Sequence, residues 1–384
     1  AIDRGTMGIV QRLDEDGNPI DIFGNEVNEP TINRFTAAVE TQRVLDRSTR
    51  TIVFGRFSYE DVRIFNLESL VVQPILEPDQ KIRLARIGAS FVRDTRERCE
   101  KGLFGRFLDD LDEDEKPGSP GEICRYNQVD ATGGSFLSAD YGLALRQLGG
   151  NISFNRFQTT YRHYYKVGAL RDTVLAANFT LGLANLFDPI DRDGNGAIDE
   201  IDLTMPISER FFSGGSTTLR GFNFEEAGPR EVVIPEGEFR DSEGNIVFLN
   251  PFTVPVGGNG LAVVNLEARI PLTRSVQVVP FYDGGNVFRR VGDLFGKDDP
   301  APVPPGDILA AINAANLRAR WSNTVGLGFR LQTPFGGALA VDYGFLLNPP
   351  EFLIPQRGPN GFDGTPAIFR LHRGNLHFRI TQTF

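Results

Sequence analysis

Several features that define common protein classes are scarce in this sequence. No window of about 18 consecutive apolar residues occurs in the 384-residue chain, so it encodes no transmembrane helix. Forty lysines and arginines face 50 aspartates and glutamates, for a net charge of −10. Binding to nucleic acid requires a basic face, so this balance argues against a nucleic-acid partner.

The residues that most enzymes use for covalent chemistry are equally scarce. The three histidines are His163, His372 and His377, and no serine lies in a G-x-S-x-G motif. The two cysteines, Cys99 and Cys124, lack the spacing of a zinc site. We therefore expect a protein that is not an enzyme. The enzymatic alternative is a barrel hydrolase of the outer-membrane phospholipase kind, in which His163 would work with a serine on a neighbouring strand.

What the chain does contain is a repeated alternation of apolar and polar residues with period two. It is clearest in segments 134–146, 174–183, 261–270, 323–332 and 338–344. Alternation predicts strands with one apolar and one polar face, which a soluble sandwich would also show. These segments reach about ten residues or more, the length that a tilted strand needs to cross a bilayer. Their polar faces carry Arg, Glu, Asp and Gly, so we favour an all-β transmembrane antiparallel barrel over the sandwich.

The connections between the predicted strands alternate between short and long along most of the chain. We predict about twelve strands, near 7–13, 31–45, 51–65, 81–94, 134–146, 151–167, 173–186, 260–271, 275–288, 319–332, 337–347 and 368–384. The short turns are 45–50, 167–172, 271–274 and 333–337, and the long polar loops are 15–31, 66–80, 188–259, 292–318 and 348–367. Such alternation is typical of periplasmic turns and extracellular loops. Two connections depart from it: 146–152 is short, and 95–133 is a long insert whose acidic run 109–115 we expect to be only a solvated loop.

Two motifs in the second half of the chain resemble a known family. The run GGSTTLRGF (214–222) resembles the sixth-loop motif of the BamA and TamA assembly factors, [V/L]-R-G-F. PFYDGGNVF (280–288) is similar to the family's F-x-D-x-G strand motif. The segments FVRDTR (91–96) and 326–344, and the terminal Phe384, follow in the family's order. The resemblance covers roughly residues 80–384, and 1–80 loosely.

The resemblance implies a specific contact inside the barrel. The long loop folds back into the lumen, and Arg220 meets Asp283 with Phe281 beside it; Gly221, Phe222 and Gly285 complete the two motifs. Strand parity supports this independently, because Asp283 shares a face with Gln277, Val279 and Phe281, while the opposite set is the better lipid face. The alternative is that Arg220 is one solvated loop charge among many.

The resemblance also implies the fold, partners and function. The family barrel has sixteen strands and is preceded by POTRA domains, so residues 1–384 are expected to form a partial barrel of about twelve C-terminal strands, without POTRA domains and unable to gate by itself. The chain begins at Ala1 without a leader, as expected of a processed protein or a fragment. The expected location is the bacterial outer membrane. The expected partners are the lipid bilayer, unfolded outer-membrane clients, and chaperones or accessory lipoproteins that bind the POTRA domains. The implied function is non-covalent insertion and folding of β-barrel proteins; the alternatives are a two-partner-secretion transporter and a passive porin.

Three further sites are expected outside the motif pair. Residues 191–202 match a twelve-residue calcium loop, with candidate ligands Asp191, Asp193, Asn195, Ala197, Asp199 and Asp202. A simple Asp/Asn-Gly turn is the alternative, and no other cofactor is expected. Cys99 and Cys124 share the insert expected in the oxidising periplasm, so we expect a disulfide. The last strand carries Phe378, Ile380 and Phe384 on one face, an ending that outer-membrane barrels use as an assembly signal.

Overall fold

The structure of the chain is a computed structural model. It describes residues 11–12, 14, 18–101, 115–117, 122–170, 172–187, 189, 191, 196, 200–235, 239–240, 246–247, 250–273, 275–296, 307–332, 338–358 and 361–381. No helix among these residues has both the length and the apolar character needed to span a bilayer.

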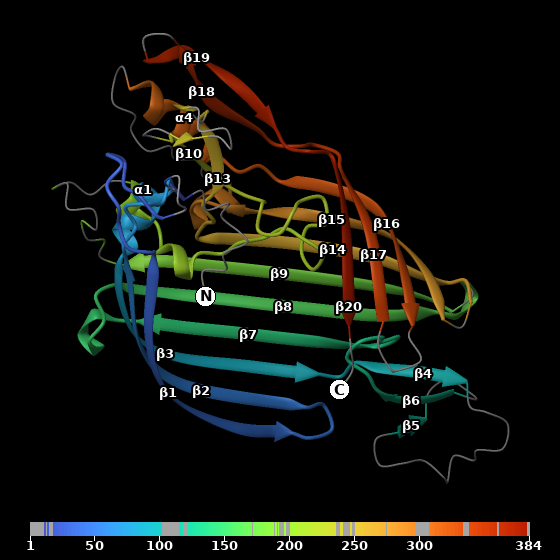
Figure 1. Ribbon diagram of the computed structural model, residues 1–384. Coiled ribbons are helices and arrows are strands. Elements are labelled where there is room, and N and C mark those ends of the chain that lie inside the picture. The colour runs from blue at the N-terminus through green and yellow to red at the C-terminus, as the bar shows by residue number, and fades with distance from the viewer. Residues whose placement is uncertain are drawn as a thin grey trace.

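One large antiparallel sheet dominates the protein and curls around an interior (Figure 1). Its neighbours follow the order of the chain from one edge to the other. The eleven strands are β1 (Thr31–Asp46), β2 (Thr51–Phe65), β3 (Lys81–Asp94), β7 (Gly134–Ala144), β8 (Ser153–Val167), β9 (Thr173–Phe187), β14 (Gly260–Pro271), β15 (Val276–Phe288), β16 (Ser322–Gln332), β17 (Ala338–Leu346) and β20 (Gly374–Thr381). The all-β prediction is thereby confirmed. Within the described strands, β1 and β20 form the two edges and are not paired with each other, so the sheet is not seen to close.

Alternation along each strand separates an inner from an outer face. In β15, Val279, Phe281 and Asp283 are buried, whereas Pro280 between them is exposed. Asp283 therefore points inward, as its parity predicts. Cross-strand pairing carries this division to the neighbours, because paired residues lie on the same face: Asp283 pairs with Asn265 on β14 and with Thr324 on β16.

The outer face is apolar and exposed over most of the sheet. Its exposed large side chains include Phe57, Ile87, Tyr141, Tyr161, Leu175, Phe179, Leu266, Leu327, Phe329, Tyr343, Phe378 and Ile380. A soluble monomer rarely exposes a contiguous apolar surface of this extent, which normally marks contact with a membrane or another protein.

The interior is filled by the long connection between β9 and β14. Met205, Phe211, Leu219 and Phe222 of this connection are buried in one hydrophobic cluster with strand residues. The strand residues of the cluster include Leu84, Ala144, Phe154, Ala184, Leu261, Val263 and Leu346. At this level the curled sheet therefore surrounds a packed loop rather than an empty channel.

Short elements cover the end of the sheet where the long connections lie. They are α1 (Gln73–Leu76), α2 (Glu200–Leu203), α3 (Val291–Leu294), α4 (Ile308–Asn316), the strand pairs β10 (Arg230–Val233) with β13 (Phe252–Pro255), β11 (Phe239–Arg240) with β12 (Ile246–Val247), and β18 (Glu351–Gly358) with β19 (Gly361–Arg370). The β18–β19 hairpin replaces the loop predicted at 348–367.

One predicted strand needs correction, and another lies largely outside the described residues. The predicted last strand, 368–384, is divided: its first three residues end β19, and β20 begins at Gly374 because residues 371–373 turn the chain from the hairpin back to β17. The predicted strand at 7–13 lies largely outside the described residues, and Gln11 forms only an isolated bridge with Leu70.

The insert between β3 and β7 forms a sheet of its own. Strands β4 (Glu97–Lys101), β6 (Glu122–Tyr126) and β5 (Glu115–Pro117) pair in that spatial order. They lie at the end of the main sheet where the chain ends and where the short turns connect strands (Figure 1). Cys99 pairs with Cys124 in the register of β4 and β6, and a disulfide joins them. The acidic run 109–115 lies almost entirely outside the described residues.

Loss of this disulfide should loosen the insert without unfolding the main sheet. Replacing both cysteines by serine removes a cross-link between residues 25 positions apart. By the chain-entropy model such a link contributes on the order of 3 kcal/mol. We expect residues 97–126 to become sensitive to protease in the variant at temperatures where wild type is protected. Labelling of two free thiols in unreduced, denatured wild-type protein would contradict the assignment.

Candidate functional site

The loop that carries the arginine motif makes a tight turn before it reaches the inner face of the large sheet, which forms the wall around the loop. Gly214 and Gly215 have φ values of 124° and 95°, which L side chains rarely adopt. The Thr218 hydroxyl accepts the Gly214 N–H at 2.9 Å, and the Gly215 N–H is donated to the carbonyls of Leu219 and Phe222 at 3.2 and 3.1 Å. The turn presents Arg220 to β15 and buries Leu219 and Phe222 beside it.

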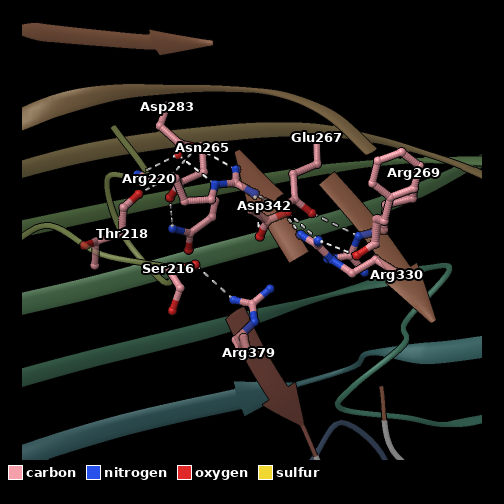
Figure 2. Close-up of polar contacts among 12 residues, drawn as sticks. Ser216, Thr218, Arg220, Asn265, Glu267, Arg269, Asp283, Arg330, Asp342 and Arg379 are labelled. Carbon is pink, nitrogen blue, oxygen red and sulfur yellow. Dashed lines mark hydrogen bonds and ion pairs between the residues drawn. The ribbon is translucent and has the colours of Figure 1, made fainter. Parts of the chain in front are cut away.

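Arg220 binds Asp283 through both its side chain and its backbone (Figure 2). Its Nε and Nη2 donate to Oδ2 and Oδ1 at 2.8 and 2.7 Å, the bidentate geometry that a guanidinium offers a carboxylate. Its backbone N–H also donates to Oδ2, at 3.1 Å. Arg220 is 3% exposed and Asp283 is fully buried, so water does not compete for either group.

A second layer of charges surrounds this pair. Arg220 Nη1 donates to Glu267 Oε1 at 2.7 Å and lies 3.7 Å from Asp342 Oδ2. The Phe281 ring centroid is 3.4 Å from the guanidinium carbon, a cation–π geometry. Burial alone would lower the pKa of Arg220, but the hydrogen bonds and charge of Asp283, with the charges of Glu267 and Asp342, raise it above its ordinary value. The arginine therefore stays charged inside the sheet.

The acidic groups are in turn shared with two wall arginines (Figure 2). Arg269 Nε donates to Glu267 Oε2 at 3.1 Å, and Arg330 Nη1 donates to Asp342 Oδ1 at 2.5 Å. Three carboxylates and three guanidiniums thus balance one another. Removal of one member from such a cluster leaves a buried charge without its partner. This destabilises the protein by much more than the intact pair stabilises it.

A known sequence family covers this site and most of the chain. Residues 125–384 match the Omp85 superfamily domain. The chain belongs to the Omp85 superfamily. The match contains both the loop motif around Arg220 and the strand motif around Asp283.

Two solved structures of low sequence identity were found by structural comparison. BamA of Haemophilus ducreyi lacking POTRA domains 1–3 is 15% identical, with a TM-score of 0.43 over 91% of this chain and 62% of that chain. The β domain of the Bordetella autotransporter BrkA is 10% identical, with a TM-score of 0.22 over 91% of this chain and 88% of that chain. This chain therefore spans less than two thirds of the BamA chain that it matches.

In this Omp85 chain, β20 also contacts the loop, through residues that belong to neither motif. Asn375 donates to the Gly221 carbonyl at 2.5 Å, and His377 Nε2 lies 2.9 Å from the Arg220 carbonyl. Arg379 donates to the Ser216 carbonyl at 3.2 Å. These three side chains occupy alternate positions on the inner face of β20. Their parity is readable from the sequence, but their partners are backbone atoms with no sequence signature.

Glycines make the close approach of loop and wall possible. A Cβ at Gly344 would collide with the backbone of Arg220, and one at Gly221 would collide with Thr324 and Leu346. Gly285 has φ 145°, and a Cβ there would strike the backbone of the adjacent β14. Gly285 thus serves strand packing rather than contact with the loop.

Of the six predicted calcium ligands, only Asp191 and Asp202 lie within the described residues. Asp193, Asn195, Ala197 and Asp199 lie outside the described residues. Asp191 is exposed and accepts the Gly196 N–H at 2.8 Å, whereas Asp202 is fully buried in α2. Calcium binding at 191–202 therefore stays a prediction.

Calcium should protect the segment from proteolysis if the prediction holds. At several millimolar Ca²⁺, the range of weak extracellular sites, we expect slower cleavage within 188–203. Asp193→Ala should abolish the protection, and Mg²⁺ at the same concentration should not produce it. Equal cleavage with and without Ca²⁺ would leave only the turn.

The predicted terminal signal is also partly visible. Phe378 and Ile380 are 68% and 72% exposed on the outer face of β20, and Phe384 lies outside the described residues. Their exposure on an edge strand leaves them available to a partner or to lipid.

Proposed function

We propose that this Omp85 chain is the barrel domain of an outer-membrane factor that helps other β-barrel proteins insert and fold, without covalent chemistry. The observation that carries the proposal is the buried contact of Arg220 with Asp283, Glu267 and Phe281, which joins the two motifs that the sequence shares with assembly factors. Membership of the superfamily supports a role in barrel assembly in general terms.

The proposed location is the bacterial outer membrane. The exposed apolar outer face of the sheet supports contact with lipid. In this orientation the short turns, the disulfide-bonded insert and the C-terminal end of β20 lie in the periplasm, and the long connections face the exterior. Closure of the sheet into a barrel, POTRA domains, accessory lipoproteins, chaperones and unfolded clients are part of the same proposal.

A passive porin and a two-partner-secretion transporter are the competing functions. A porin needs an open channel, and the burial of Leu219 and Phe222 inside the sheet argues against one. A secretion transporter would use the same loop but would export a soluble substrate instead of inserting barrels.

Reconstitution into liposomes tests the assembly function and separates it from a porin. The purified protein, with whatever POTRA domains its full chain carries, is mixed with a urea-denatured eight-stranded barrel protein as client. We expect folded client to accumulate faster than in empty liposomes, and bilayer recordings of the same protein to lack a steady open conductance. Client folding no faster than in empty liposomes would overturn the proposal, and a steady conductance would favour the porin.

A further inference from the structure

A second charged contact holds the loop at a different part of the sheet. The loop enters the interior through a short 3₁₀ helix, Ile207–Glu209, in which Glu209 is 9% exposed. Arg86 on β3 donates from Nη2 to Glu209 Oε1 at 2.6 Å. Nothing in the arginine motif or the strand motif accounts for this buried carboxylate.

An aromatic contact lies two residues further along the loop. The Phe211 ring centroid is 4.3 Å from the guanidinium carbon of Arg156 on β8. Phe211 is buried, and its backbone pairs with Gly258 by hydrogen bonds of 2.8 and 3.0 Å. A cation over an aromatic ring thus recurs here, with the ring on the loop and the arginine on the wall.

The wall is shaped to receive this contact. A Cβ at Gly182 on β9 would lie 2.8 Å from the Phe211 ring, so only glycine leaves the ring its space. A Cβ at Gly142 on β7 would lie 3.2 Å from the Arg86 side chain. The Ile207 N–H also donates to buried Asp79, at 2.7 Å, which ties the same segment to the connection between β2 and β3.

The two contacts lie far apart in the sheet. Arg86 and Arg156 belong to the third and fifth strands in spatial order, whereas Asp283 belongs to the eighth and the β20 contacts to the eleventh. We propose that Glu209, held by Arg86 with Phe211 seated on Arg156, is a second anchor, so that residues 209–220 brace two separate parts of the wall. Glu209 is then a positioning residue for the loop that presents Arg220.

The charges make this anchor specific. Arg86 donates to the buried carboxylate of Glu209, and a neutral glutamine would keep the shape of that side chain but remove the negative charge that the guanidinium meets. The proposal uses the lumenal loop of the proposed function, but its readout is backbone exchange and does not depend on client folding.

Hydrogen–deuterium exchange of the full protein in detergent tests the anchor. In Glu209→Gln we expect amides in 204–213 to exchange roughly tenfold faster or more, because a charged hydrogen bond shifts a local opening equilibrium by such a factor. Amides of 218–222 should remain protected by the Asp283 contact. The matched control is Glu226→Gln in the same loop. The Glu226 carboxylate accepts the nearby Asn223 N–H at 2.9 Å, so this change should leave exchange in 204–213 unaltered.

Charge exchange separates a specific pair from general loosening. Arg86→Glu alone places two carboxylates together and should release 204–213 further. Arg86→Glu combined with Glu209→Arg restores the pair and the charge balance, and should return exchange toward wild type. Unchanged exchange in Glu209→Gln, or no recovery in the double variant, would overturn the second anchor even if client folding is normal.

Discussion

Arg220→Ala and Asp283→Ala are each expected to lower the thermal stability of the protein much more than the loss of an exposed surface charge does. Each change leaves its former partner buried without the group that made two side-chain hydrogen bonds to it, and breaking a buried ion pair in this way typically costs about 3–5 kcal/mol. The double variant should lose much less than the sum of the two, because it removes both charges together. Thermal loss of β-sheet circular dichroism in detergent measures all three. Arg220→Lys should also be damaging, since an ammonium cannot reproduce the bidentate contact.

The matched control for this cycle is Arg63→Ala. Arg63 also forms a two-hydrogen-bond contact with an aspartate, Asp61, but its side chain is 49% exposed on β2. Its loss should have little effect, because exposed pairs contribute little. Additive effects of Arg220→Ala and Asp283→Ala would contradict a direct coupling inside the sheet.

Phe222→Ala should destabilise the packing of the loop against the sheet by about as much as loss of the Arg220–Asp283 ion pair. Phe222 is fully buried in the cluster that includes Leu219, Leu261 and Leu346. Truncation of a buried phenylalanine to alanine costs about 3–5 kcal/mol through lost burial and the cavity that remains. We expect a lower unfolding temperature and faster proteolysis of residues 204–226.

Phe224→Ala gives the control in the same loop. Phe224 is 60% exposed two residues further on, so its truncation leaves no buried cavity. Equal sensitivity of the two variants to heat and protease would show that burial of Phe222 does not hold the loop.

Much of the main sheet could be predicted because each strand carries its own alternation. The positions of β8 and β15 follow from local residue order, and their antiparallel pairing follows from short turns. The inward side chain of Asp283 follows from the same period. Prediction failed at the start of 368–384, because residues 368–370 pair with β18 in a local hairpin and residues 371–373 turn the chain before β20 pairs with β17.

The partners within the site were less predictable than its centre. Motif resemblance indicated Arg220 and Asp283, but the roles of Glu267 and Asp342 depend on the register of neighbouring strands. The contacts of His377 and Arg379 are made to loop carbonyls, which every residue possesses. Glu209 is one of 50 acidic residues, and only the path of the loop past Arg86 distinguishes it.

The most direct test of the account is the rate of client folding in proteoliposomes that contain wild type or Arg220→Ala at equal amounts of folded protein. The loop contact is proposed to be required for assembly, so Arg220→Ala should fold client no faster than empty liposomes, while Arg63→Ala should match wild type. Wild-type client folding by Arg220→Ala, with its loop shown to be released by faster exchange of residues 218–222, would contradict the account.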